Sequence, residues 1–144
     1  MPENPLNVLL IEPHTWWREI VVASLARWPE YRLVGSAASG MEGIERAMAL
    51  QPAVVVFDFH LPDLDIADLV GALQTLEPAP KFLLLTAEPD EAIRRFAGQF
   101  GLAGVVRKNT RVPEHLPAAL GEIRASRRYL PSEWQGAPTA SHRT

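Results

Sequence analysis

Three short runs of successive apolar residues constrain the fold of this 144-residue chain more than any other feature. They are "VLLI" at 8–11, "VVVF" at 54–57 and "FLLL" at 82–85. Because side chains alternate between the two faces of a strand, an uninterrupted apolar run predicts a strand that is buried on both faces. Strands of this kind belong to parallel sheets covered by helices on both sides. The three runs therefore favour an α/β fold.

Two further short runs and several stretches of helical periodicity extend this pattern along the whole chain. Between the first two runs, apolar side chains recur every three or four residues from Trp17 to Trp28, and Pro29 ends the predicted helix. Similar stripes start near residues 41, 66, 92 and 116. The order of elements is βαβαβαβαβα, which predicts a five-stranded, parallel, doubly wound sheet. The expected strands span residues 6–11, 32–36, 53–58, 81–86 and 103–106.

Composition excludes several classes of protein. The net charge is −3 and the chain shows no basic stripe, so it is not expected to bind DNA tightly by itself. The absence of cysteine excludes disulfides and thiolate sites. No apolar run approaches the roughly 20 residues of a membrane helix, and "MPENPLN" lacks the features of a signal peptide. We therefore expect a cytoplasmic protein without membrane contacts.

Polar residues follow four of the five predicted strands at the same end. Glu12 follows the first strand, Asp58 and Thr86 end the third and fourth, and Lys108 comes shortly after the fifth. Each alone has an ordinary structural explanation, such as a helix cap, a turn or a solvated loop. In a doubly wound sheet, however, the ligand site lies beyond the C-terminal ends of the strands. Their joint placement therefore predicts a charged site at this edge.

With these residues in place, the chain resembles the receiver domain of two-component response regulators over roughly residues 7–130. The matching segments are the acid after the first strand, "VVVFDFHLPDLD", "LLLTA" and "GVVRKN". The start of the first helix and the ending "RYLPSEW" resemble the NarL/FixJ-type subfamily. The resemblance implies a flavodoxin-like (βα)5 fold and a signal-receiving module that controls transcription. Beyond self-catalysed aspartyl phosphorylation and dephosphorylation, no enzyme activity is expected.

The resemblance also implies roles for individual residues. Asp58 would be the phosphoacceptor, Thr86 the switch hydroxyl and Lys108 the phosphate-binding amine. Glu12, Asp58 and the backbone carbonyl of His60 would hold Mg²⁺. Expected partners are a sensor histidine kinase or a small phosphodonor and a second copy of the chain, with DNA bound only through an output domain that this chain lacks.

Pro13 departs from the family pattern at the most sensitive point. Receivers generally carry two adjacent acids after the first strand, and the second commonly ligates the metal. Proline supplies neither charge nor a side-chain ligand, so the affinity for Mg²⁺ should fall. His14, being a poor Mg²⁺ ligand, is expected to begin the first helix.

Further departures lie near the same edge of the sheet. Val105 replaces the usual aromatic residue of the fifth strand, and Ile66 makes the neighbouring loop more apolar. Core packing is the favoured interpretation of Trp17, whereas Trp16 either packs in the core or covers the mouth of the pocket. These changes together predict an atypical receiver.

Two alternatives from other classes compete with this interpretation. A degenerate receiver would act as a dimerisation or interaction module independent of phosphate. A haloacid-dehalogenase-type phosphatase would also place a nucleophilic aspartate after a parallel strand. That chemistry needs a second acid two residues later, where this chain has His60. A nucleotide-binding protein is disfavoured because no glycine-rich loop follows the first strand.

The chain is expected to divide into a receiver domain, residues 1–130, and a flexible tail or linker, residues 131–144. Two basic surfaces are candidates for dimerisation, although ordinary solvation is the favoured explanation of each single charge. One carries Arg94, Arg95, Arg107 and Arg111, and the other carries Arg124, Arg127 and Arg128.

Overall fold

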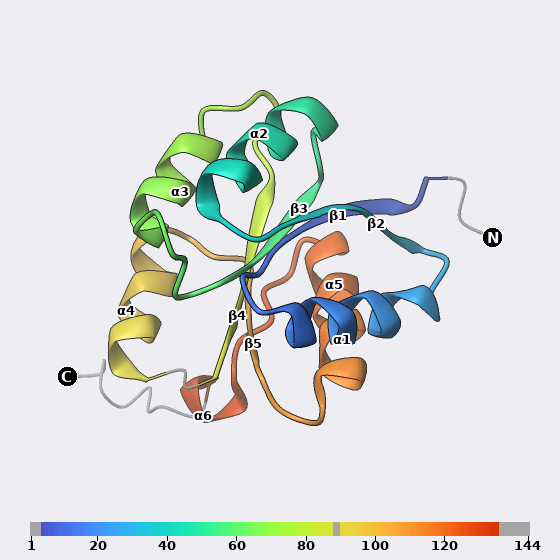
Figure 1. Ribbon diagram of the computed structural model, residues 1–144. Helices are drawn as coiled ribbons and strands as arrows, with labels where there is room; N and C mark the ends of the chain where they lie inside the picture. The colour runs from blue at the N-terminus through green and yellow to red at the C-terminus, as the bar shows by residue number, and fades with distance from the viewer. Residues whose placement is uncertain (1–3, 88–89, 136–144) are drawn as a thin grey trace.

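The computed structural model describes residues 4–87 and 90–135 and confirms the expected doubly wound sheet. Five parallel strands lie in the order β2-β1-β3-β4-β5, and helices cover both faces (Figure 1). No helix in these residues is long and apolar enough to cross a bilayer. The strands are β1 (Leu6–Ile11), β2 (Tyr31–Ala37), β3 (Val54–Asp58), β4 (Lys81–Thr86) and β5 (Gly104–Arg107). The helices are α1 (Thr15–Ala26), α2 (Gly40–Leu50), α3 (Ile66–Leu73), α4 (Glu91–Gln99), α5 (Val112–Arg124) and α6 (Ser132–Gln135).

The three apolar runs form the centre of the sheet. Every residue of β3 is buried, and so are the last four residues of β1 and the last five of β4. Alternate side chains of these strands enter two separate cores. One core lies under α2, α3 and α4, and the other lies under α1 and α5 (Figure 1). Asp58 and Thr86 thus lie at the C-terminal ends of buried central strands.

Polar caps set the beginnings of three helices on the site side. The side chains of Ser39, Asp65 and Asp90 accept hydrogen bonds from the first-turn amides of α2, α3 and α4, respectively. Capping of this kind satisfies amides that have no partner within the helix. Asp90 caps α4. Thr86 therefore does not cap this helix, which was one ordinary structural explanation of its position.

Asp63 joins the loop after β3 to the start of α2. Its carboxylate accepts hydrogen bonds from the amides of Gly40, at 2.7 Å, and Met41, at 3.0 Å. The amide of Met41 is the largest cause that lowers the pKa of Asp63 below 3.8, followed in the same direction by the amide of Gly40. The ionised carboxylate is therefore bound more strongly in the folded chain than in the unfolded chain.

An Asp63→Asn variant should lose stability in a pH-dependent way. A lowered folded-state pKa means that the stabilisation is present above the unfolded-state value and disappears as the pH falls through the folded-state value. We expect a loss of at most about 1 kcal/mol near pH 7, since Asp63 is exposed and screened by water. Thermal unfolding of both proteins across the acid range checks this. A difference that persists undiminished at the lowest pH would contradict it.

The chain after α5 returns to the edge of the sheet. Tyr129 pairs in parallel with Gly104 at the start of β5, and residues 132–135 form the short helix α6. In Figure 1, α6 lies beside the lower ends of α4 and β5. The first part of the segment expected to be a tail is therefore helical, while residues 136–144 of that segment lie outside the described residues.

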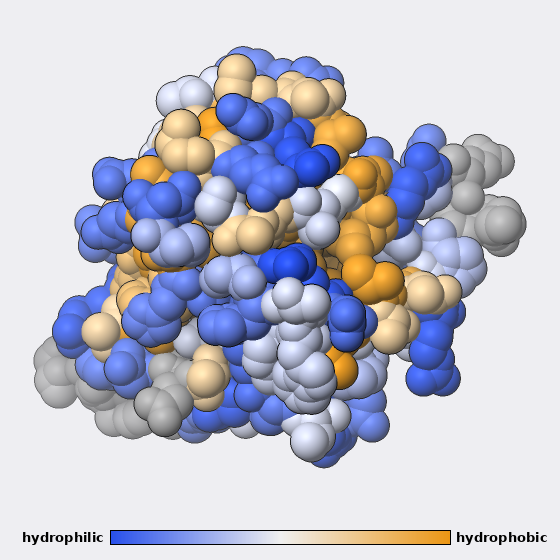
Figure 2. All heavy atoms as spheres, in the orientation of Figure 1, coloured by the Kyte–Doolittle hydropathy of each residue, from blue (hydrophilic) through white to orange (hydrophobic). Residues whose placement is uncertain are grey.

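Apolar surface lies beside β2, the strand at the opposite edge of the sheet. Figure 2 shows a mainly hydrophilic face on which hydrophobic side chains gather between α2 and α1, beside β1 and β2. The exposed hydrophobic side chains of these two helices include Val22, Met48 and Leu50. The molecule thus leaves apolar surface beside β2 and covers part of β5 with its own chain.

Candidate functional site

The residues predicted from the strand ends converge on one edge of the sheet. Glu12 directly follows β1, Asp58 and Thr86 end β3 and β4, and Lys108 directly follows β5. Glu12, Asp58 and Thr86 are all buried, with exposed fractions of 0%, 5% and 4%. Burial of two acids and a hydroxyl beside an apolar core requires polar partners. Their partners decide what the site can do.

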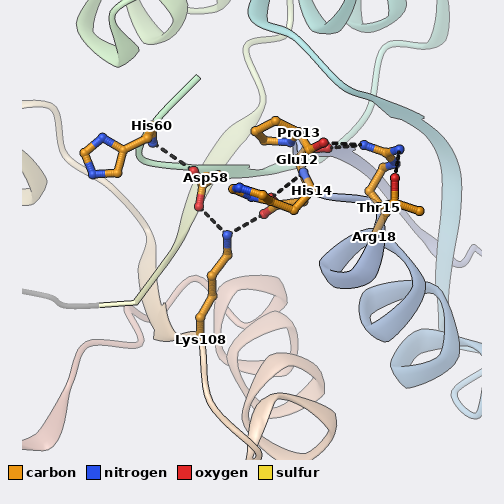
Figure 3. A network of polar contacts seen from close by, with 8 residues as sticks. All are labelled: Glu12, Pro13, His14, Thr15, Arg18, Asp58, His60 and Lys108. Carbon is orange, nitrogen blue, oxygen red and sulfur yellow. Dashed lines mark hydrogen bonds and ion pairs between the residues drawn. The ribbon is translucent and has the colours of Figure 1, made fainter. Parts of the chain in front are cut away.

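Lys108 is the partner that the two acids share. Its Nζ lies 2.5 Å from Oδ1 of Asp58 and 2.8 Å from Oε1 of Glu12. Figure 3 shows the side chain extended from the end of β5 to a position between the two carboxylates. Only 6% of this side chain is exposed, and Nζ also lies 5.5 Å from the ring centroid of Trp17. One ammonium therefore pairs with two carboxylates, which leaves a formal charge of −1 in the group.

Glu12 is held on both sides. Its Oε2 accepts a hydrogen bond from the amide of His14 at 3.0 Å and lies 3.0 Å from Nδ1 of the same residue. Its Oε1 is buried and, among the described residues, has no hydrogen-bond partner and contacts Lys108 through the ion pair. His14 precedes the first residue of α1, as expected, but its ring contacts Glu12 instead of capping the helix.

Arg18 fixes the turn that carries Pro13, and sequence reasoning missed it. Its Nη1 donates to the carbonyl oxygens of Glu12, at 2.7 Å, and Pro13, at 3.1 Å (Figure 3). Its Nη2 donates to Oγ1 of Thr15 at 3.1 Å. No sequence pattern separates this arginine from a solvated helix residue, because its partners are backbone carbonyls. Arg18 thus ties together the turn between β1 and α1, in which Pro13 offers no side-chain ligand and its carbonyl oxygen is already hydrogen-bonded.

Asp58 also has a protein partner for each oxygen. Oδ1 pairs with Lys108, and Oδ2 accepts the amide hydrogen of His60 at 2.9 Å. Figure 3 shows the His60 ring pointing away from Lys108. These two contacts fix the orientation of the Asp58 carboxylate. The structure thus involves His60 through its amide, and the metal-binding role of its carbonyl stays a prediction.

A cleft of about 610 Å³ opens over this group. Trp16 is 62% exposed and packs edge-to-face against Trp17, with 4.9 Å between the ring centroids. Trp17 also packs against the core under α1 and α5, as expected, whereas Trp16 lies at the cleft. Ile66 is buried in the other core and does not line it. The lining residues are His14, Trp16, Trp17, Asp58, Phe59, His60, Thr86, Ala87, Asp90, Ala92, Ile93 and Lys108.

The acidic group has donor atoms of the kind that Mg²⁺ binds. Mg²⁺ takes hard oxygen ligands and often keeps several waters, with one or two carboxylates from the protein. Glu12 and Asp58 provide two carboxylates, and the buried Oε1 of Glu12 still lacks a hydrogen bond. Among residues 4–87 and 90–135, no group of three or more acidic or histidine side chains could hold a metal ion. Glu12 and Asp58 thus offer carboxylates of the kind that Mg²⁺ binds, and the described residues add no third acidic or histidine side chain to form a group with them.

Comparisons with known proteins agree with the expected family. Residues 8–120 match the family model "Response regulator receiver domain". The chain is 31% identical over 119 residues to the probable transcriptional regulatory protein NarL of Mycobacterium tuberculosis, covering 83% of this chain and 55% of that protein. It is 30% identical over 126 residues to the putative positive transcription regulator BvgA of Bordetella pertussis, covering 88% and 59%. These relatives confirm the expected NarL/FixJ-type likeness.

Other relatives share only this part of their length. The protein-glutamate methylesterase/protein-glutamine glutaminase of Desulfitobacterium hafniense is 32% identical over 93 residues, which cover 63% of this chain and 24% of that protein. The chain thus spans about a quarter of the length of this relative and between half and two thirds of the regulators. The activity in the name of this relative describes that whole protein, of which the match covers about a quarter.

Solved structures confirm the fold. The receiver domain of the putative response regulator NarL from Mycobacterium tuberculosis superposes with a TM-score of 0.75 at 29% identity, covering 84% of this chain and 98% of that one. The non-phosphorylated receiver domain of RcsB from Escherichia coli superposes with a TM-score of 0.82 at 23% identity, covering 89% of this chain and 99% of that one, which shows the fold alone.

The family match does not support the phosphatase alternative, and it favours the phosphate-receiving interpretation over the degenerate one. The chain belongs to the response regulator receiver domains, the signal-receiving modules of two-component systems.

Proposed function

We propose that Asp58 accepts a phosphoryl group from a sensor histidine kinase or a small phosphodonor. The observation that carries the proposal is the position of Lys108, whose Nζ lies 2.5 Å from Asp58 at the base of an open cleft. A phosphoryl group on Asp58 would have a fixed cation beside it and space above it. We further propose that residues 1–130 form the receiver domain and that residues 131–144 form a tail or linker.

The residues around Asp58 would divide the chemistry among them. One carboxylate oxygen attacks phosphorus, and the bond between phosphorus and the donor's leaving group breaks in line. Lys108 balances the charge on the phosphoryl oxygens, and Thr86 donates its hydroxyl to one of them. The amide of His60 already holds the other oxygen of Asp58, at 2.9 Å, and keeps the nucleophile oriented.

Glu12, Asp58 and the carbonyl of His60 would hold the Mg²⁺ ion. When bound, the ion supplies positive charge that offsets the developing charge on the phosphoryl oxygens. Pro13 has no side-chain oxygen, its carbonyl oxygen accepts a hydrogen bond from Arg18, and both carboxylate oxygens of Glu12 already face His14 or Lys108. We therefore propose a lower affinity for Mg²⁺ than in a receiver with two adjacent acids at this position.

Phosphorylation would redistribute the contacts of Lys108. A phosphoryl group on Asp58 competes with Glu12 for the same ammonium, so the ion pair of 2.8 Å should weaken. The amide of Lys108 donates to the carbonyl of Thr86 at 2.8 Å, which ties the ends of β5 and β4 together. Movement of Lys108 and Thr86 would shift the ends of β4 and β5 from one conformation to another.

The output would be control of transcription through association of two copies. Support comes from the regulators NarL and BvgA and from a solved structure described as two RcsB dimers bound to DNA. DNA contact would need an output domain, because the chain has a net charge of −3. Bringing two such domains together would raise their joint affinity for paired half-sites.

Incubation with acetyl phosphate and Mg²⁺ tests the proposal. Intact mass should show the addition of one phosphoryl group to the wild-type chain and none to Asp58→Ala. Asp68→Asn removes an exposed acid in the first turn of α3 and should behave as wild type. An equal gain in Asp58→Ala, or no gain in any protein at high donor concentration, would contradict the proposal.

A further inference from the structure

The segment between α5 and α6 binds to the edge of the sheet with backbone hydrogen bonds. The amide of Tyr129 donates to the carbonyl of Ala103 at 2.9 Å, and the amide of Val105 donates to the carbonyl of Tyr129 at 2.8 Å. Nε of Arg128 donates to the carbonyl of Leu102 at 3.1 Å. These contacts satisfy groups of an edge strand that would otherwise be open to pairing.

Side chains of the same segment cover the surface between α4 and β5. Trp134 packs against the core under α2, α3 and α4, and its carbonyl accepts a hydrogen bond from Nη2 of Arg94 at 3.4 Å. Glu133 forms an ion pair with Arg107, the last residue of β5. Two of the four arginines on this candidate dimerisation surface therefore contact the chain's own segment.

From these contacts we infer that residues 129–134 act as an intramolecular ligand of the α4–β5 surface, and that a second copy of the chain binds there only after they are displaced. The inference does not depend on phosphorylation of Asp58, because the contacts exist without it. The competing occupant is a second copy because release would expose an edge strand beside partly buried aromatic side chains. An open edge of this kind pairs readily with another strand.

The segment is held weakly enough to be displaced. A helix of four residues such as α6 has no stability of its own and depends on its contacts. The pair of Arg107 and Glu133 is 37% and 54% exposed, so water and salt weaken it. Arg107, which pairs with Glu133, is also the register partner of Thr86 in β4 and directly precedes Lys108 in the chain.

Sedimentation equilibrium of three variants of the 144-residue chain tests the inference. Trp134→Ala combined with Glu133→Ala should dimerise at a concentration at least about tenfold lower than the wild type. Glu133→Arg, which removes only the ion pair and repels Arg107, should shift dimerisation in the same direction by less. Ser132→Ala, an exposed position of α6, is the matched control and should equal the wild type.

Two further measurements separate release of the segment from loss of the fold. Hydrogen exchange of the Val105 amide should accelerate in the double variant, while amides of the buried strand β3 stay protected. A peptide spanning residues 128–135, added in excess, should return the double variant to the monomer. If the variants associate no more strongly than Ser132→Ala, or exchange at Val105 is unchanged, the inference is wrong.

Discussion

Replacing Lys108 with methionine should destabilise the fold by about 3 kcal/mol at neutral pH, the usual loss when one partner of a buried ion pair is removed. The variant leaves Glu12 and Asp58, which are 0% and 5% exposed, without the ammonium that both contact. Phosphorylation by acetyl phosphate should also slow by at least about a hundredfold, because a fixed charge that stabilises the transition state is lost. Denaturant unfolding and time-resolved intact mass measure the two effects.

The chain has a matched control for this experiment. Lys81, its other lysine, is exposed at the start of β4, and Lys81→Met should leave both stability and phosphorylation close to the wild type. Lys108→Met with wild-type stability would show that the two buried acids do not depend on the ammonium. Unchanged phosphorylation kinetics would remove Lys108 from the proposed chemistry.

Replacing Pro13 with aspartate should raise the affinity for Mg²⁺ by about tenfold or more, since even the loss of a group that only orients a metal ligand costs about 10–100-fold in affinity. The new carboxylate would follow Glu12 at the end of β1, in a turn already fixed by Arg18. A Mg²⁺ titration followed by tryptophan fluorescence measures the change, because Trp16 and Trp17 both line the cleft.

Pro13→Ala separates the added oxygen from the removed ring. Alanine restores the amide hydrogen and the backbone freedom that proline lacks, but it adds no ligand. Its Mg²⁺ affinity should therefore stay near that of the wild type. If alanine raises the affinity as much as aspartate does, backbone rigidity rather than the missing carboxylate limits metal binding.

The fold and the centre of the site could be predicted because both follow from local chemistry. Runs of apolar residues in β1, β3 and β4 predicted strands buried on both faces. Stretches of helical periodicity between the strands predicted that the strands are parallel. Once the strands were parallel, their C-terminal ends had to meet at one edge. The topology therefore brings Glu12, Asp58 and Lys108 together, although Glu12 and Lys108 are 96 positions apart in the chain (108 − 12).

The rest of the site depends on contacts that leave no pattern in the sequence. Arg18 binds two backbone carbonyls, and His14 uses its ring and its amide on the same oxygen of Glu12. A solvated arginine or histidine at these positions would look the same. The docking of Trp134 was likewise hidden, because the composition around it is that of a linker. Strand ends shifted by one residue, as in β2 and β5, where hydrogen bonding rather than apolar character sets the boundary.

Identification of the residue that carries the phosphoryl group tests the central claim most directly. The wild-type chain would be treated with acetyl phosphate and Mg²⁺, reduced with borohydride to mark any acyl phosphate, and digested for peptide mass analysis. Because Asp58 lies beside Lys108 and Glu12, we expect the product of borohydride reduction at position 58 alone. A mark at Glu12, at an exposed acid such as Asp68, or at no position in a chain with native thermal stability would contradict the account.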